Sequence, residues 1–245
     1  GKDCQVLLFI YLGCLWEFFL IHINKSQFEP EYHKFPLAKL PTVFIDQEET
    51  FPTLEQFVSD TSERYFLSLY ESVRDERKPV SMSEAFEKFL GLYPETKGIV
   101  IGIRHTDPYA QDLKPIQRTD PNWPDFIRLQ PLLHWKLSHI WSFLLYSGEP
   151  ICGLYNVGFT SIGSIKETVP NPFLKVTDNN QRSSMFQWEI EHTFNREANR
   201  KNGSINCSEL HEQDQKRLND LGEDYLPGWH LIDDTLERAG RLKKG

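Results

Sequence analysis

Three residues at the start of the chain have types and spacing suited to binding phosphate. Gly1, Lys2 and Asp3 stand directly before a long apolar run that is expected to be helical. A helix N-terminus presents free backbone N–H groups and a positive partial charge, which attract phosphate. A lysine there adds a compact mobile charge, and an aspartate could hold Mg²⁺. Taken alone the signal is weak, because an arbitrary chain end could also carry these residues.

A second group of candidates follows the clearest strand pattern, the apolar run at residues 98–103. Arg104 could pair with a phosphate, and Asp107 could bind a metal ion or a hydroxyl. Asp46 has the same place after the strand expected at residues 41–46, and could accept from a ribose hydroxyl or an adenine amine. In open α/β sheets, ligands bind beyond the carboxyl ends of the strands. An Asp-Pro turn with a surface arginine, and a turn acid or helix cap at residue 46, are the alternatives.

A third group lies in a proline-rich stretch, residues 104–131, which contains five prolines and little periodicity. A loop this long in a compact domain is usually functional or disordered, and its aromatic, arginine and aspartate residues favour function. A flat heteroaromatic ligand could stack on Trp123 while Asp120 accepts from a ring N–H. The alternative is a tryptophan that only anchors the loop.

The tail, residues 229–244, is expected to form an amphipathic helix with a basic end. Arg238 and Arg241 are three residues apart and would share one face of that helix, where they could bind phosphates. Lys243 and Lys244 add to the positive charge. Cations are also favoured at any helix C-terminus, which is the alternative explanation.

Other catalytic patterns are missing from the sequence. The eight histidines show no H-x-H or H-E-x-x-H spacing, and there is no G-x-S-x-G motif and no complete Walker loop. These absences argue against metal-dependent hydrolysis and serine acyl transfer. The four cysteines form no C-x-x-C pair, which is typical of reduced intracellular thiols.

The elements that must position these residues alternate between strand and helix. Besides the two strands, helices are expected from Thr53 to Val73, from Ser81 or Ser83 to Leu90, and from Leu137 to Tyr146. This alternation predicts an α/β fold with a mostly parallel sheet.

The apolar run at residues 6–23 allows a membrane span, a secretory signal or a helix buried on all sides. Glu17 inside the run argues against a span, and no small-x-small cleavage pattern follows it. We therefore expect a buried helix.

The chain of 245 residues has room for no more than two domains, and its net charge of −8 argues against a protein that coats nucleic acid.

Taken together, several stretches closely resemble the eukaryotic FAD synthases (FMN adenylyltransferases), most like the single-domain fungal enzymes of the PAPS reductase-like superfamily. They cover residues 1–16, 43–52, 102–135, 140–163 and 227–241. The resemblance implies a Rossmann-like, mostly parallel sheet with helices on both faces (adenine nucleotide alpha hydrolase-like), followed by a C-terminal helical or irregular extension. A nucleotide-binding domain is expected over residues 1–175 and the extension over 176–245. In the family, GKD ends a longer pyrophosphate loop, so we expect this chain to start inside that loop.

The resemblance further implies transfer of AMP from MgATP to FMN, giving FAD and pyrophosphate, by in-line attack of the FMN phosphate on the α-phosphorus. The expected ATP side comprises Gly1, Lys2, Asp3, Asp46, Ile101, Gly102 and Ile103. The expected FMN side comprises Arg104, Asp107, Asp120, Pro121, Asn122, Trp123 and Arg128. Lys2, Asp107, Arg238 and Arg241 are the expected catalytic residues, and Asp3 and Asp107 the expected Mg²⁺ ligands.

Two other functions stay open at this point. A sulfonucleotide reductase shares the fold, but it needs a reactive cysteine near the C-terminus, and Cys207 lies in a polar Asn-Cys-Ser setting. A non-catalytic nucleotide- or flavin-binding protein would carry the same pockets. We expect a cytoplasmic monomer that acts on small molecules and binds neither nucleic acid nor membrane.

Overall fold

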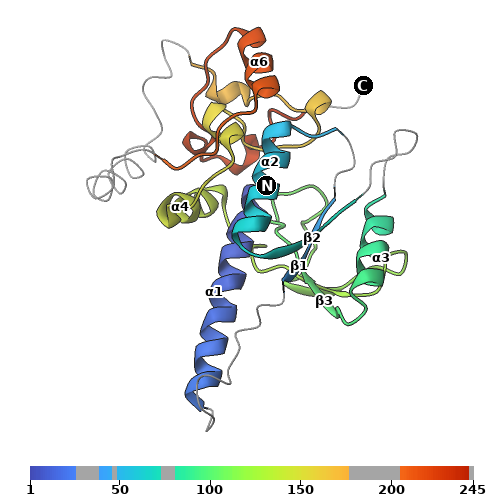
Figure 1. Cartoon of the computed structure of the whole chain (residues 1–245). Helices are drawn as coiled ribbons and strands as arrows, with labels where there is room; N and C mark the ends of the chain where they lie inside the picture. Colours follow the sequence, from blue (N-terminus) through green and yellow to red (C-terminus); the bar gives the residue numbers. More distant parts are fainter. Residues whose placement is uncertain (26–38, 46–48, 73–80, 177–204, 243–245) are drawn as a thin grey trace.

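Helices and strands alternate through the part of the chain that the computed structural model describes, residues 1–25, 39–45, 49–72, 81–176 and 205–242 (Figure 1). The main elements, in chain order, are α1 (Lys2–Lys25), β1 (Leu40–Phe44), α2 (Pro52–Arg64), β2 (Leu67–Glu71), α3 (Met82–Leu92), β3 (Gly98–Val100), β4 (Ile116–Arg118), β5 (Ile127–Leu129), α4 (Leu137–Ser147) and α6 (Glu212–Leu221). Short 3₁₀ turns connect the later elements, including η2 (Gly153–Val157).

The strands form two small sheets within the described residues. β1 and β2 run parallel, with Leu40 opposite Leu67, and α2 is the connection between them. In the second sheet the order is β3-β5-β4, where β3 and β5 are parallel and β4 and β5 antiparallel. The α/β fold with parallel strands is confirmed, although the expected single sheet is described as two pieces.

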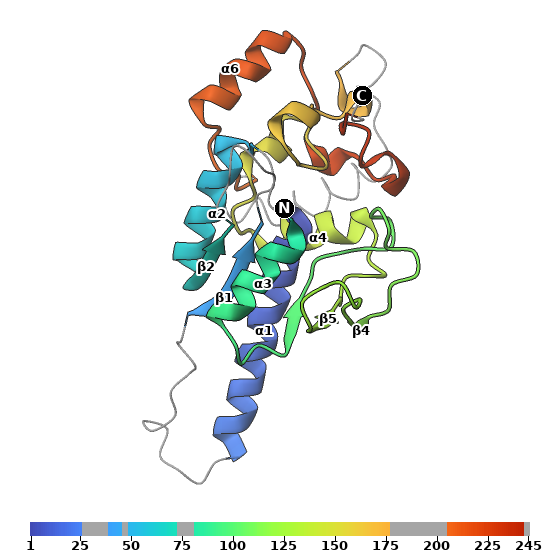
Figure 2. The ribbon, with the colours of Figure 1, turned by 90° about the vertical axis from the view of Figure 1, so that its right-hand side faces the viewer.

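The hydrophobic core lies around α4 and the start of α1. Leu137, Ile140, Trp141 and Leu144 of α4 are fully buried, and Val6 of α1 packs in the same cluster. Figure 2 shows α4 beside the N-terminal end of α1, with the later 3₁₀ segments above them. The core therefore surrounds the point at which the predicted phosphate-binding residues begin.

Two of the expected helices are confirmed. The side chain of Ser81, one of the two starts that the sequence allowed, accepts a hydrogen bond from the backbone N–H of Glu84 and caps α3. The helix expected at 137–146 is α4, which Gly148 ends in the left-handed conformation with φ of 66°.

The helix expected from Thr53 to Val73 is wrong in its second half. α2 starts at Pro52 and stops at Arg64, and β2 follows after Phe66, whose φ is 53°. The apolar positions 65, 69 and 73 are four residues apart, a spacing that fits one face of a helix and equally one face of a strand. Val73 itself lies outside the described residues.

The expectation of an amphipathic helix over residues 229–244 is also wrong. The described part of the tail forms 3₁₀ turns at Gly228–His230 and Asp234–Leu236, followed by further turns. Its backbone bonds to another segment instead: the N–H of Val169 donates to the carbonyl of Gly240 at 2.9 Å, and the N–H of Leu242 to that of Glu167 at 2.8 Å. These tertiary partners replace the hydrogen bonds of a helix.

The apolar run forms α1, but the expectation that it is buried on all sides holds only for its first turns. Val6 and Leu7 are buried, whereas Trp16 is 53% and Phe18 70% exposed, and Figure 1 shows α1 extending away from the other elements. By length and composition, Lys2–Ile23 could cross a membrane, with a mean hydropathy of 2.1. Core helices of soluble proteins and signal sequences pass the same test.

The segments assigned to the two expected domains are in contact. β-bridges join Ile151 to Cys207 and Lys175 to Tyr225, and Thr168 pairs with Arg241. The division between residues 175 and 176 stays a prediction.

Candidate active site

A buried ion cluster lies at the N-terminus of α1, formed by Lys2, Asp3, Arg104, Asp234 and Glu237. Lys2 is 3% exposed, and its Nζ donates to Asp3 Oδ2 at 3.1 Å and to Glu237 Oε1. Arg104 is fully buried and donates from Nε to Asp3 Oδ1 at 2.6 Å and from Nη1 to Asp234 Oδ1 at 2.9 Å. Its Nη2 donates to Glu237 Oε2. Two cations and three carboxylates from three separate parts of the chain therefore meet at one point.

The charges of this cluster reinforce one another. Burial lowers the pKa of the Lys2 ammonium, but Asp3 and Glu237 raise it by more, so that it lies above its ordinary value. Burial raises the pKa of the Asp3 carboxyl, and Lys2 and Arg104 lower it further than that. The pKa of Arg104 is likewise raised by Asp3 and Glu237 against the effect of burial. The ion pairs thus hold Lys2, Asp3 and Arg104 in their charged forms.

The local backbone explains why these residues meet. A Cβ on Gly102 would lie 3.0 Å from the backbone nitrogen of Cys4 and 3.1 Å from the carbonyl carbon of Asp3. The chain after β3 therefore passes directly against the first turn of α1, an approach that glycine allows. Residues 101–103 and 1–3, both predicted to bind ATP, are brought together as the sequence suggested.

Asp107 forms a turn with Arg104. Its Oδ2 accepts from the backbone N–H of Arg104 at 2.9 Å, and its own N–H donates to the carbonyl of Arg104 at 2.9 Å. The turn is the one that the sequence allowed as an alternative, but the surface arginine expected with it is wrong, because Arg104 is fully buried. The binding and catalytic roles expected of both residues stay predictions, and Asp46 lies outside the described residues.

The C-terminal segment contributes two residues that sequence reasoning missed, Asp234 and Glu237. They were overlooked because the tail was interpreted as a basic helix. Acidic side chains between the basic residues of such a helix are expected to be exposed to solvent. The signal was available: the tail reads IDDTLER, with three acids before the first arginine. Arg238 is exposed and Arg241 half-buried in a stretch of turns, so the argument that they share a helix face is wrong.

Arg241 nevertheless has a defined environment. A Cβ on Gly163 would lie 2.1 Å from Arg241 Nη2, so the guanidinium lies directly over the backbone of that glycine. The roles predicted for Arg238 and Arg241 toward phosphate stay predictions, and Lys243 and Lys244 lie outside the described residues.

Four of the predicted flavin-side residues, Asp120, Pro121, Asn122 and Trp123, lie on the loop between β4 and β5, and Arg128 lies on β5 beside it. Arg128 Nη2 donates to Asp120 Oδ2 and to the carbonyl of Arg118, both at 3.2 Å, and the backbone N–H of Trp123 donates to the carbonyl of Asp120 at 2.9 Å. The Trp123 ring lies 6.0 Å from the Phe86 ring of α3. Pro121 and Asn122 are exposed in the same turn. The structure thus brings Asp120, Trp123 and Arg128 together.

The buried ion cluster and this loop sit at different ends of the second sheet. The loop enters β5 at Ile127, which pairs with Gly98 at the start of β3, whereas Arg104 follows the end of β3. Arg104, predicted to belong with the flavin-side residues, is fully buried in the ion cluster instead.

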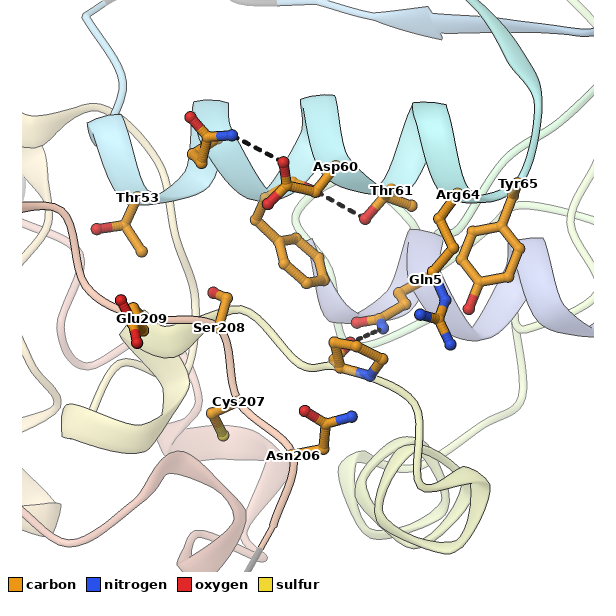
Figure 3. Close-up of a pocket in the computed structure, with 13 residues that line it drawn as sticks. Gln5, Thr53, Asp60, Thr61, Arg64, Tyr65, Asn206, Cys207, Ser208 and Glu209 are labelled. Atoms are coloured by element: carbon orange, nitrogen blue, oxygen red, sulfur yellow. Dashed lines mark hydrogen bonds between the residues drawn. The ribbon is translucent and has the colours of Figure 1, made fainter.

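A separate cavity lies away from both groups of residues. A pocket of about 580 Å³ is bounded by α2, Gln5, Pro150 and residues 206–209 (Figure 3). None of the predicted site residues lines it. Gln5 Nε2 donates to the carbonyl of Pro150 at 2.6 Å, and among the described residues its buried Oε1 has no hydrogen-bond partner. The pocket has charged side chains of its own, Asp60, Arg64 and Glu209. We assign the chemistry to the ion cluster because the predicted phosphate-binding residues Lys2, Asp3 and Arg104 meet there.

The described residues contain no group of three or more histidine, cysteine, aspartate or glutamate side chains that could hold a metal ion. The four cysteines are free.

Comparison with known proteins decides the family. The model of the phosphoadenosine phosphosulfate reductase domain matches residues 1–170. The flavin adenine dinucleotide synthase of Saccharomyces cerevisiae is 61% identical over 244 residues, which cover 99% of this chain and 79% of that protein. The chain belongs to the FAD synthase family.

Further relatives agree with this assignment. A probable FAD synthase of Schizosaccharomyces pombe is 35% identical over 178 residues, covering 73% of this chain and 61% of that protein. The crystal structure of Candida glabrata FMN adenylyltransferase in complex with FAD and inorganic pyrophosphate superposes with a TM-score of 0.86 at 58% identity, over 98% of this chain and 79% of that one. The same enzyme with FMN and an ATP analogue superposes at 0.81, with 57% identity over 98% of this chain and 78% of that one. The Rossmann-like architecture implied by the resemblance is thereby confirmed for this FAD synthase family member.

Proposed function

We propose that this chain is an FMN adenylyltransferase that makes FAD and pyrophosphate from FMN and ATP. The observation that carries the proposal is the meeting of Lys2, at the N-terminus of α1, with the segment after β3 in the same buried cluster. The 61% identity to a protein named flavin adenine dinucleotide synthase supports it. The Candida glabrata enzyme, 58% identical, was crystallised with FAD and pyrophosphate, the two products of this reaction.

The reaction proceeds as an in-line displacement. An oxygen of the FMN phosphate attacks the α-phosphorus of ATP, a new P–O bond forms, and the bond between the α-phosphorus and the bridging oxygen breaks to release pyrophosphate. No protein nucleophile is required, so the protein contributes positioning and electrostatic stabilisation. The Lys2 ammonium and the positive N-terminal end of α1 bind the ATP phosphates, where charge builds up on the leaving group.

The flavin side of the site is assigned to the β4–β5 loop. The Trp123 ring offers a flat surface for the isoalloxazine ring, and the ion pair of Arg128 with Asp120 holds a carboxylate beside it. That carboxylate is 62% exposed and can accept from a flavin N–H. Arg238 and Arg241 remain candidates for binding phosphate.

ATP enters the reaction as its Mg²⁺ complex in this proposal. Asp3 and Asp107 flank the phosphate-binding end of α1, and the lowered pKa of Asp3 keeps it ionised at neutral pH. One or two carboxylates are what Mg²⁺ requires when phosphates and water supply its other ligands, so these residues fit. When bound, the ion would neutralise charge on the phosphates. A monomeric state and a cytoplasmic location complete the proposal.

The test is an end-point assay with the purified chain, FMN, ATP and MgCl₂, separating flavins by chromatography and measuring pyrophosphate enzymatically. We expect equal amounts of FAD and pyrophosphate, and little of either from a Lys2→Met variant. Flavin and ATP binding without any turnover would contradict the proposal and favour a non-catalytic binding protein.

A further inference from the structure

Glu237 joins the two cations of the buried ion cluster. Its Oε1 accepts from Lys2 Nζ and its Oε2 accepts from Arg104 Nη2, and the residue is 4% exposed. One carboxylate therefore links the start of α1 to the segment after β3. Asp3 also bonds to both cations, but it is the immediate neighbour of Lys2 and moves with it. Glu237 is the link that comes from outside α1.

The backbone that carries Glu237 is fixed from the opposite side. Thr160 Oγ1 donates to the carbonyl of Glu237 at 2.6 Å, and Asn171 Nδ2 donates to the carbonyl of Leu236 and to Thr160 Oγ1, each at 2.9 Å. Thr160 and Asn171 are both buried. The carboxylate therefore projects from an anchored segment, and the position of its oxygens is set by the fold.

A lysine ammonium on its own is poorly positioned, because it ends a flexible four-carbon stem. Here Nζ lies 5.9 Å from the centre of the Trp141 ring and uses two of its three donors on Asp3 and Glu237 within the described residues. One donor remains for a phosphate oxygen. Asp3, Glu237 and the Trp141 ring thus position the ammonium before a substrate binds. Of these three contacts, the one with Glu237 comes from the C-terminal segment.

We propose that Glu237 is a positioning residue for adenylyl transfer, which holds the Lys2 ammonium where it meets the phosphates of ATP. The inference rests on the proposed function. Glu237 acts through Lys2 and is not itself a catalytic residue. It also makes the ATP side of the site depend on the C-terminal segment, although that segment follows the matched family domain, residues 1–170.

The test is steady-state kinetics of Glu237→Gln with ATP as the varied substrate. An amide presents one acceptor oxygen and one NH₂ group, so one of the two cations faces a donor in place of its carboxylate oxygen. We expect kcat/KM for ATP to fall about 100-fold, the cost of a misplaced catalytic group. Glu237→Asp retains the charge and should recover part of that loss.

A double-mutant cycle separates positioning from a merely structural role. If Glu237 acts through Lys2, the glutamine substitution should cause little further loss in a Lys2→Met background. Asp214→Asn is the matched control, since Asp214 is 1% exposed and accepts from Thr53 N and Oγ1, outside the ion cluster. We expect its kcat/KM to stay within threefold of the parent.

Two results would overturn the inference. One is a kcat/KM for ATP of Glu237→Gln within threefold of the parent value, and the other is an equally large fall in kcat/KM when Glu237→Gln is added to Lys2→Met. If the glutamine variant does not fold, Glu237→Asp is carried through the same cycle. Absence of FAD formation by the parent chain would count against the proposed function instead. In that event, calorimetry would measure the affinity of the parent, the two single variants and the double variant for ATP. The coupling between the two substitutions would then decide whether Glu237 acts through Lys2.

Discussion

Replacing Arg104 by methionine should destabilise the protein strongly, because Arg104 is the centre of the buried ion cluster. Its guanidinium is fully buried and bonds to Asp3, Asp234 and Glu237. Methionine is long enough to fill much of the space but leaves three carboxylates beside Lys2 alone. Removing one partner of a buried ion pair costs about 3–5 kcal/mol, since the remaining charge is left without compensation. Three such charges place the expected loss at the upper end of that range.

The magnitude can be converted into a measurable shift. Domains of this size lose about 2–4 °C of melting temperature per kcal/mol, so about 3–5 kcal/mol corresponds to a fall of about 6–20 °C. The assay is urea unfolding at pH 7 together with calorimetry. Arg118→Met is the matched control, because the Arg118–Asp125 pair is exposed (74% and 65%) and should leave the melting temperature unchanged.

The same variant has a pH dependence with a defined sign. The pKa of Asp3 lies below its ordinary value in the native protein, so its ion pairs stabilise the fold above the ordinary carboxyl pKa and lose that effect as pH falls. Without Arg104, Asp3 loses one of the two cations that lower its pKa against the effect of burial, so it protonates at a higher pH than in the parent. The difference between variant and parent should therefore be largest at pH 7 and shrink toward pH 4. A melting-temperature change under 2 °C, or a difference that does not vary with pH, would refute the reasoning.

Three further predictions concern other parts of the molecule. Trp123→Ala should weaken FMN binding about five- to 150-fold, because it removes a stacking surface worth about 1–3 kcal/mol. A change under twofold in a flavin-fluorescence titration would contradict this. Gly240→Ala should lower the free energy of unfolding by about 1–3 kcal/mol, because the added Cβ would lie 2.4 Å from a backbone oxygen. Gly91 lies in α3, and a Cβ there would meet nothing within 4 Å, so Gly91→Ala should raise the free energy of unfolding by about 0.5–1 kcal/mol. Urea midpoints equal to that of the parent would contradict the predictions for the two glycine variants. Burial raises the thiol pKa of Cys207 to about 11, so its alkylation should be slow at pH 7 and faster as the pH rises toward 11, as measured by mass spectrometry. Equal labelling of Cys207 and the exposed Cys14 at pH 7 would contradict this prediction.

Elements whose local signals agree with their tertiary setting could be predicted from the sequence. Ser81 caps α3 by a local hydrogen bond, and the apolar run around Leu137 has a helical period, so both helices follow from short stretches of chain. These features depend on residues within a few positions of each other.

Features decided by distant partners could not be predicted. The tail has the spacing of an amphipathic helix, yet its backbone bonds to residues 167–169, which no local pattern reveals. Glu237 looks like a surface acid until the fold places it between Lys2 and Arg104. The exposure of Phe18 was missed for a related reason, since an apolar sequence predicts burial without stating what covers it.

The central claim is that this chain transfers the adenylyl group of ATP to FMN. The most direct measurement is isotope tracing, with the chain incubated with FMN, Mg²⁺ and ATP labelled in its α-phosphate, and in parallel with ATP labelled in its γ-phosphate. The account predicts that the α label appears in FAD and the γ label only in pyrophosphate. Label from the γ-phosphate in any flavin, or no α label in FAD, would contradict it.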